Sequence, residues 1–156
     1  MLAVVYKGVA IPVYWLMLNK KGISSTRERI ALLNRLIQQF GKGRIIKLLA
    51  DREFVGKDWF GWLKAQGVDF AIRIKKPSLS TNRQGQVVPV NTLFRLLPVG
   101  ETQILPGERK LFDTRVFLSA LRLADGELLI VATATSGCVP SEATPCVGRL
   151  RRSSVA

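Results

Sequence analysis

The chain has 156 residues, 47% of them hydrophobic, which fits one folded domain with a real core, alone or with an appendage. Lysine and arginine number 24 against 11 aspartates and glutamates, so the net charge is +13 and a polyanion, most simply nucleic acid, is the expected partner. Histidine is absent, which excludes serine-histidine-aspartate triads, cysteine-histidine pairs and zinc sites that need histidine.

The apolar N-terminal stretch, residues 2–18, predicts two antiparallel strands and no membrane segment. Lys7-Gly8 interrupts it, and the remaining run Val9–Leu18 is too short to span a bilayer. The strands are expected at about Leu2–Tyr6 and Val9–Met17. We therefore expect a cytoplasmic protein without a membrane partner.

A helix is predicted after Ser25, which forms a capping box with Glu28, and Gly41 is expected to end it. Its apolar face carries Ile30, Leu33, Leu36, Ile37 and Phe40. Basic residues occupy its other face and its exit, and they are either a solvated surface or contacts to nucleic-acid phosphates. The candidates for phosphate contact here are Arg27, Arg35 and Arg44.

The next segment predicts an α/β crossover. The apolar residues Ile45, Ile46, Leu48 and Leu49 predict a buried strand that leads to Asp51. Trp59, Trp62 and Leu63 then follow at helical spacing, and Gly67 is expected to end that helix. A second strand is expected at residues 68–74, with Phe70, Ile72 and Ile74 on one face.

Open α/β sheets place their chemistry outside the carboxyl ends of their strands, so Asp51 is a candidate functional acid. Its alternatives are an N-cap of the following helix or a salt bridge to Arg52. Glu53 is expected to support the strand end. Further candidates for phosphate contact are Arg52, Arg73, Lys75 and Lys76, although the lysines and Arg73 are equally typical of a strand end that extends its charges into solvent.

After residue 76 the sequence becomes β-rich. Residues 78–86 predict a loop, and Asp125-Gly126 predicts a hairpin turn. From residue 134 onward no period is present, and the chain is expected to be disordered, with Cys138 and Cys146 as free thiols. The expected strands are Gln86–Val90, Asn91–Leu97, Thr102–Leu105, Arg115–Leu123 and Glu127–Thr133.

Four sequence blocks carry a family resemblance: residues 8–12, 19–22 and 27–29 and, above all, Asp51-Arg52-Glu53-Phe54-Val55-Gly56-Lys57-Asp58-Trp59-Phe60. Together they resemble the middle of a DDE transposase, most closely the bacterial insertion-sequence transposases of the "IS four" group. The resemblance implies an α/β fold with a ribonuclease H-like core that lacks its first strand and its last catalytic helix. It further implies that Asp51 matches the second acid of the D-D-E set, a ligand of Mg²⁺ or Mn²⁺ in DNA cleavage and strand transfer.

The departures from the family pattern concern the other two acids. The family's first Asp lies on a strand before Leu2, and its Glu lies on a helix after residue 133, where Glu142 lacks that context. We therefore expect a truncated fragment that is inactive by itself and poorly soluble or homodimeric. The alternative is a non-catalytic basic DNA-binding remnant, or a protein that interferes with an intact transposase. The expected parts are a partial core (1–76), a β-rich insertion (77–133) and a disordered or frameshifted tail (134–156).

Overall fold

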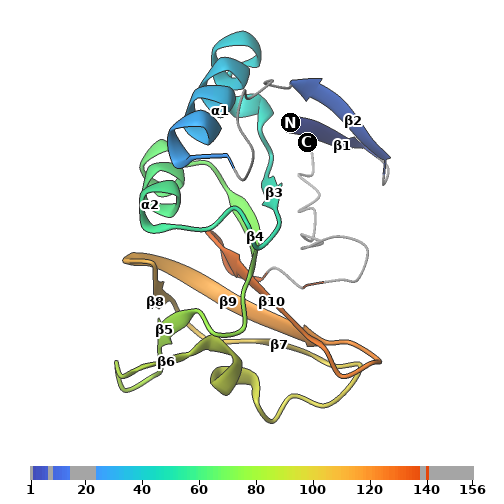
Figure 1. Ribbon diagram of the computed structural model, residues 1–156, viewed down its shortest axis with the longest axis vertical. Helices are drawn as coiled ribbons and strands as arrows, with labels where there is room; N and C mark the ends of the chain where they lie inside the picture. The colour runs from blue at the N-terminus through green and yellow to red at the C-terminus, as the bar shows by residue number, and fades with distance from the viewer. Residues whose placement is uncertain (1, 7–8, 15–23, 138–139, 141–156) are drawn as a thin grey trace, which may run out of the picture. The chain divides into compact units, whose positions relative to one another are not determined.

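The structure is a computed structural model that describes residues 2–6, 9–14, 24–137 and 140 (Figure 1). The chain divides into two compact units, residues 1–46 and residues 47–156, which are taken separately. The predicted tail beyond residue 137 lies outside the described residues except for Pro140, and so do both cysteines. No helix in the described part of the chain is long and apolar enough to cross a membrane.

The first unit contains a hairpin and a capped helix. Strands β1 (Leu2–Tyr6) and β2 (Val9–Tyr14) pair antiparallel, which confirms the predicted hairpin; residues 15–17 of the predicted second strand lie outside the described residues. Helix α1 (Thr26–Phe40) begins with the predicted capping box, in which the Ser25 N–H donates to Glu28 Oε2 at 2.6 Å. Gly41 ends α1 as predicted, and the short 3₁₀ helix η1 (Lys42–Arg44) follows.

In its described residues the second unit is an eight-stranded sheet with one α-helix. Its strand order is β3-β4-β10-β9-β8-β5-β6, and β7 also pairs with β9. The elements are β3 (Leu48–Ala50), α2 (Lys57–Gln66), β4 (Phe70–Ile74), β5 (Leu79–Thr81), β6 (Val87–Pro89), the 3₁₀ helix η2 (Val90–Phe94), β7 (Thr102–Ile104), β8 (Arg109–Leu111), β9 (Thr114–Arg122) and β10 (Leu128–Thr133).

The predicted crossover is present, since β3 and β4 are parallel and α2 connects them. Gly67 adopts the left-handed conformation (φ 61°) that ends α2, as expected for a glycine cap. On its other side β4 pairs antiparallel with β10, so strands from before and after Pro77 share one sheet. The predicted division into a partial core (1–76) and a β-rich insertion (77–133) remains a prediction.

The predicted buried strand at Ile45–Leu49 is wrong in its bounds and its burial. Strand β3 starts three residues later, its residues are only partly buried, and Ile46 is 81% exposed. The reason is position: β3 is the end strand of the sheet and pairs only with β4 among the described strands. An end strand has a neighbour on one side only, so its side chains are less buried than those of a central strand. Hydrophobicity alone therefore overestimates the burial of β3.

The predicted alternation in the next strand is also incomplete. Phe70, Ile72 and Ile74 are buried, as expected, but Ala71 is fully buried too. Strand β4 lies between β3 and β10, and its second face packs in a cluster with Leu49 and Val131. A strand that is covered on both faces has no solvent-facing side, so its sequence need not alternate between apolar and polar residues.

Two further expectations after residue 76 fail locally. Residues 78–86, predicted as a loop, contain β5, which pairs with β6 and β8. The predicted strand Asn91–Leu97 is replaced by η2, because a 3₁₀ turn brings both Val90 and Phe94 into the core at 0% exposure. The hairpin at Asp125-Gly126 is confirmed by the antiparallel pairing of β9 with β10.

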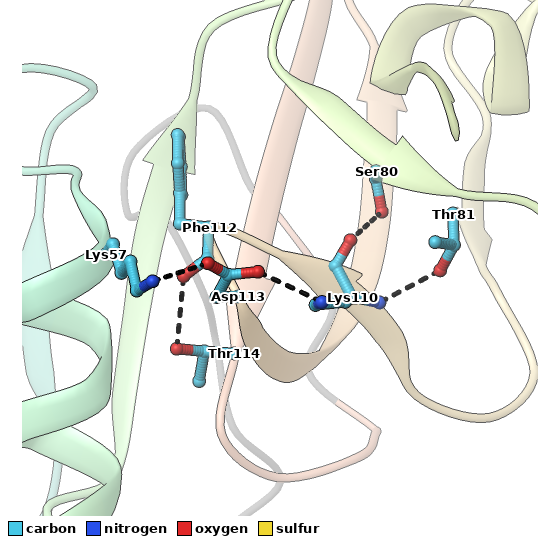
Figure 2. A network of polar contacts seen from close by, with 7 residues as sticks. All are labelled: Lys57, Ser80, Thr81, Lys110, Phe112, Asp113 and Thr114. Atoms are coloured by element: carbon cyan, nitrogen blue, oxygen red, sulfur yellow. Dashed lines mark hydrogen bonds and ion pairs between the residues drawn. The ribbon is translucent and has the colours of Figure 1, made fainter. Parts of the chain in front are cut away.

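The turn between β8 and β9 has a backbone conformation that is unusual for its residues. Phe112 and Asp113 both have positive φ values, 49° and 59°, in the pattern of a type I′ turn that glycine or asparagine usually occupies. Asp113 accepts from Lys57 Nζ at 2.8 Å and from Lys110 Nζ at 3.0 Å (Figure 2). These contacts fasten the turn to the start of α2.

The two lysines lower the pKa of Asp113 from 3.8 to about 2, through their hydrogen bonds first and their charges second. A depressed carboxyl pKa contributes stability above the unfolded value, and that contribution is lost as the pH falls from about 4 to about 2. We expect Asp113→Asn, which tolerates positive φ, to unfold at lower urea concentration than the wild type at pH 6. The urea midpoints of the variant and the wild type should converge near pH 2. A difference between them that stays constant from pH 6 to pH 2 would contradict the ion-pair account.

Candidate functional site

Asp51 follows β3 directly and is exposed at the carboxyl end of that strand, as predicted. One carboxylate oxygen, Oδ1, accepts from the Arg52 backbone N–H at 2.8 Å, and the Phe54 N–H closes the turn on the Asp51 carbonyl at 2.9 Å. The alternative roles fail: Gly56 is the N-cap of α2, and no ion pair joins Asp51 to Arg52 in the described part of the chain. The turn presents the carboxylate outward.

Glu53 links this turn to the end of β4. Its Oε1 lies 3.2 Å from Lys75 Nζ, and the two side chains are 41% and 48% exposed. Since Lys75 directly follows β4, the pair connects the segment after β3 with the segment after β4. This contact is consistent with the predicted support of the strand end.

An open cleft of about 450 Å³ lies next to this connection. Four of the seven predicted phosphate contacts line it, and they come from the turn after β3 and from the end of β4 and the segment that follows. Two carboxylates from different loops also line it, so the cleft has more positive than negative charge. Its polar lining consists of Arg52, Arg73, Lys75, Lys76, Glu53 and Glu127, and Ile74, Pro77 and Leu128 complete the wall.

The four basic residues differ in their partners. Arg73 Nη2 lies 3.3 Å from Glu127 Oε1, and Lys75 pairs with Glu53 as described above. For the side chains of Arg52 and Lys76, the described residues offer no ion-pair partner. The cleft therefore has two basic groups available to an anion and two that are each paired with a different carboxylate.

The other three predicted phosphate contacts belong to the first unit. Arg27 and Arg35 are exposed on α1, and Arg44 is exposed at the end of η1. Their role in DNA binding remains a prediction.

Among the described residues, Asp51 is the predicted metal ligand. Asp51 offers the hard carboxylate oxygen that Mg²⁺ prefers, but such sites use several oxygen ligands. Within the described residues no three acidic, histidine or cysteine side chains are grouped closely enough to hold a metal. The described residues therefore do not by themselves fit a two-metal centre.

Sequence reasoning missed Glu127 as a member of the cleft. It lies after the hairpin turn of β9 and β10, more than fifty positions from Arg73, and only the pairing of β4 with β10 brings the two together. No local pattern carries that information.

The fold and cleft define a mixed α/β domain, mostly sheet at its core, with an exposed carboxylate at a strand end and a basic cleft beside it. The family model of the transposase DDE domain matches residues 3–114, more than half of the 156 residues. The chain belongs to this transposase DDE domain family. Among the curated proteins, none matches the chain.

Proposed function

We propose that this chain is a fragment of a transposase of the bacterial "IS four" insertion-sequence group, with a ribonuclease H-like core in which Asp51 is one catalytic acid. The observation that carries the proposal is the parallel pair β3 and β4, joined by α2, with Asp51 directly after β3. In open α/β sheets this is where functional side chains gather. Family membership supports DNA transposition as the process and DNA as the partner.

The chain alone does not cleave or join DNA in this proposal. The family's chemistry places two divalent metals, Mg²⁺ or Mn²⁺, on several carboxylates, and Asp51 would hold one of them. Other ligands would come from residues outside the described part or from another chain. Homodimerisation and a cytoplasmic location belong to the same proposal.

A second candidate is residual DNA binding without catalysis, including interference with an intact transposase. The basic lining of the cleft favours it, because contacts from arginine and lysine to phosphate give affinity without sequence information.

The test combines two measurements on the purified chain. Plasmid incubated with Mg²⁺ or Mn²⁺ should stay supercoiled; nicking that disappears in Asp51→Ala would show that the chain is catalytic by itself. Labelled duplexes of two unrelated sequences should bind with equal affinity, and the affinity should fall steeply with salt. A flat salt response, or no binding at low salt, would exclude the DNA-binding candidate.

Cleft variants localise the binding. Replacing both Arg52 and Lys76 with alanine should reduce the log–log salt slope by about 1.8, since each phosphate contact contributes about 0.9. The matched control replaces Arg83 and Arg95, two exposed arginines of the same unit outside the cleft, and should leave the slope nearly unchanged. Equal losses in both double variants would mean that overall charge, and not the cleft, holds the DNA.

A further inference from the structure

Two carboxylates in the basic cleft form ion pairs with two of its four basic side chains. Glu127 lies 3.3 Å from Arg73, and Glu53 lies 3.2 Å from Lys75. In the first pair the arginine side chain is 28% exposed and the glutamate 38% exposed, so both are within reach of a ligand in the cleft.

A DNA phosphate would compete with Glu127 for the same donor. An arginine guanidinium binds a phosphate best through two parallel N–H donors, and a carboxylate on one of them blocks that arrangement. The Glu127 charge also repels a phosphate in the same cleft. Ion pairs this exposed are weak, so a phosphate can displace the carboxylate, but the displacement lowers the net affinity.

We propose that Glu127 is an internal competitor for nucleic-acid phosphate at Arg73 and thereby limits the affinity of the cleft for a DNA backbone. The proposal rests on the DNA-binding role assigned above. It predicts a gain on removing an acidic side chain, which a purely structural ion pair does not. Glu53 acts in the same sense at Lys75, but its place beside Asp51 makes it a less clean test.

The chain offers a matched control for Glu127. Glu108 pairs with Lys64 of α2 at 3.4 Å, outside the cleft, and these two side chains are 32% and 33% exposed. Glu127→Gln and Glu108→Gln therefore each remove one negative charge and free one basic partner at similar exposure. They differ in whether the freed partner lines the cleft.

The experiment titrates a labelled DNA duplex with the full chain by fluorescence anisotropy at low salt. Glu127→Gln should lower the Kd about three- to tenfold, and Glu108→Gln less than about twofold. Most of the gain should vanish when Arg73→Ala is added, because the competition acts through that guanidinium. Glu127→Asp, which keeps the charge but draws it back from Arg73, should give a smaller gain and serves as the second variant if Glu127→Gln unfolds.

The outcomes separate this inference from the proposed function. If the wild type binds and Glu127→Gln binds no better than Glu108→Gln, the competition is overturned and DNA binding stands. If Glu127→Gln binds more weakly, Glu127 positions Arg73 for DNA and the competition is again overturned. If neither the wild type nor any variant binds at low salt, both fail together.

Discussion

Replacing Phe60 with alanine is expected to lower the free energy of unfolding by about 3–5 kcal/mol, the usual cost of deleting a buried aromatic side chain. Phe60 is 0% exposed in α2. Its ring centroid lies 5.2 Å from that of Phe70 in β4 and 5.5 Å from that of Phe112 in the β8–β9 turn. One side chain thus joins α2, strand β4 and the positive-φ turn.

Urea denaturation, followed by the fluorescence of Trp59 and Trp62 in α2, measures this loss. The control is Leu96→Ala in the same unit, where the side chain is 85% exposed and the expected change is within about 0.5 kcal/mol. A Phe60 variant as stable as the Leu96 variant would mean that the helix does not pack on β4 as described.

Replacing Arg122 with alanine should cost about 2–4 kcal/mol, because a charged donor to several backbone carbonyls would be lost. The guanidinium of this β9 residue donates to the carbonyls of Leu97 at 2.6 Å, Phe94 at 3.2 Å and Gly126 at 3.2 Å. It therefore ties the end of η2 and the β9–β10 turn to one strand.

Arg122→Lys separates charge from geometry, since an ammonium group cannot reproduce the planar set of donors. Compared with Arg122→Ala, this variant should restore less than half of the lost free energy of unfolding, as measured by urea denaturation. Arg115→Ala, a change at an exposed arginine on the same strand, is the control and should be nearly neutral. Full rescue by lysine would contradict the role of the three carbonyl contacts.

The sequence was sufficient wherever a local rule decides the structure. The capping box at Ser25, the glycine at 67 and the hairpin at Asp125-Gly126 all depend on residues within a few positions of one another, and all three are confirmed. The misjudged burial of β3 and β4 depends on long-range pairing. The burial of β3 follows from its place at the end of the sheet, which no nearby residue encodes.

The same distinction holds for the candidate site. Asp51 was found because a strand and its terminal acid are adjacent in sequence. The β8–β9 turn was missed because Phe112-Asp113 carries none of the glycine or asparagine signals of a type I′ turn, and tertiary contacts with Phe60 and Lys57 hold it instead. Glu127 was missed because the strand pairing that brings it to Arg73 spans much of the chain.

The position of β4 between β3 and β10 also determines when β4 can complete its pairing during synthesis of the chain. Ile74 pairs with Ile130 and Ala71 with Thr133, so the inner edge of β4 has no partner strand until the ribosome has made residues 130–133. Until then the crossover of β3, α2 and β4 has an unpaired apolar edge, the kind of surface that chaperones bind and that promotes aggregation. Contacts this distant in sequence also slow folding, because the chain between them must be closed before they form. Strand β10, the last described strand along the chain, thus completes both the core and the basic cleft, to which it brings Leu128 and the adjoining Glu127.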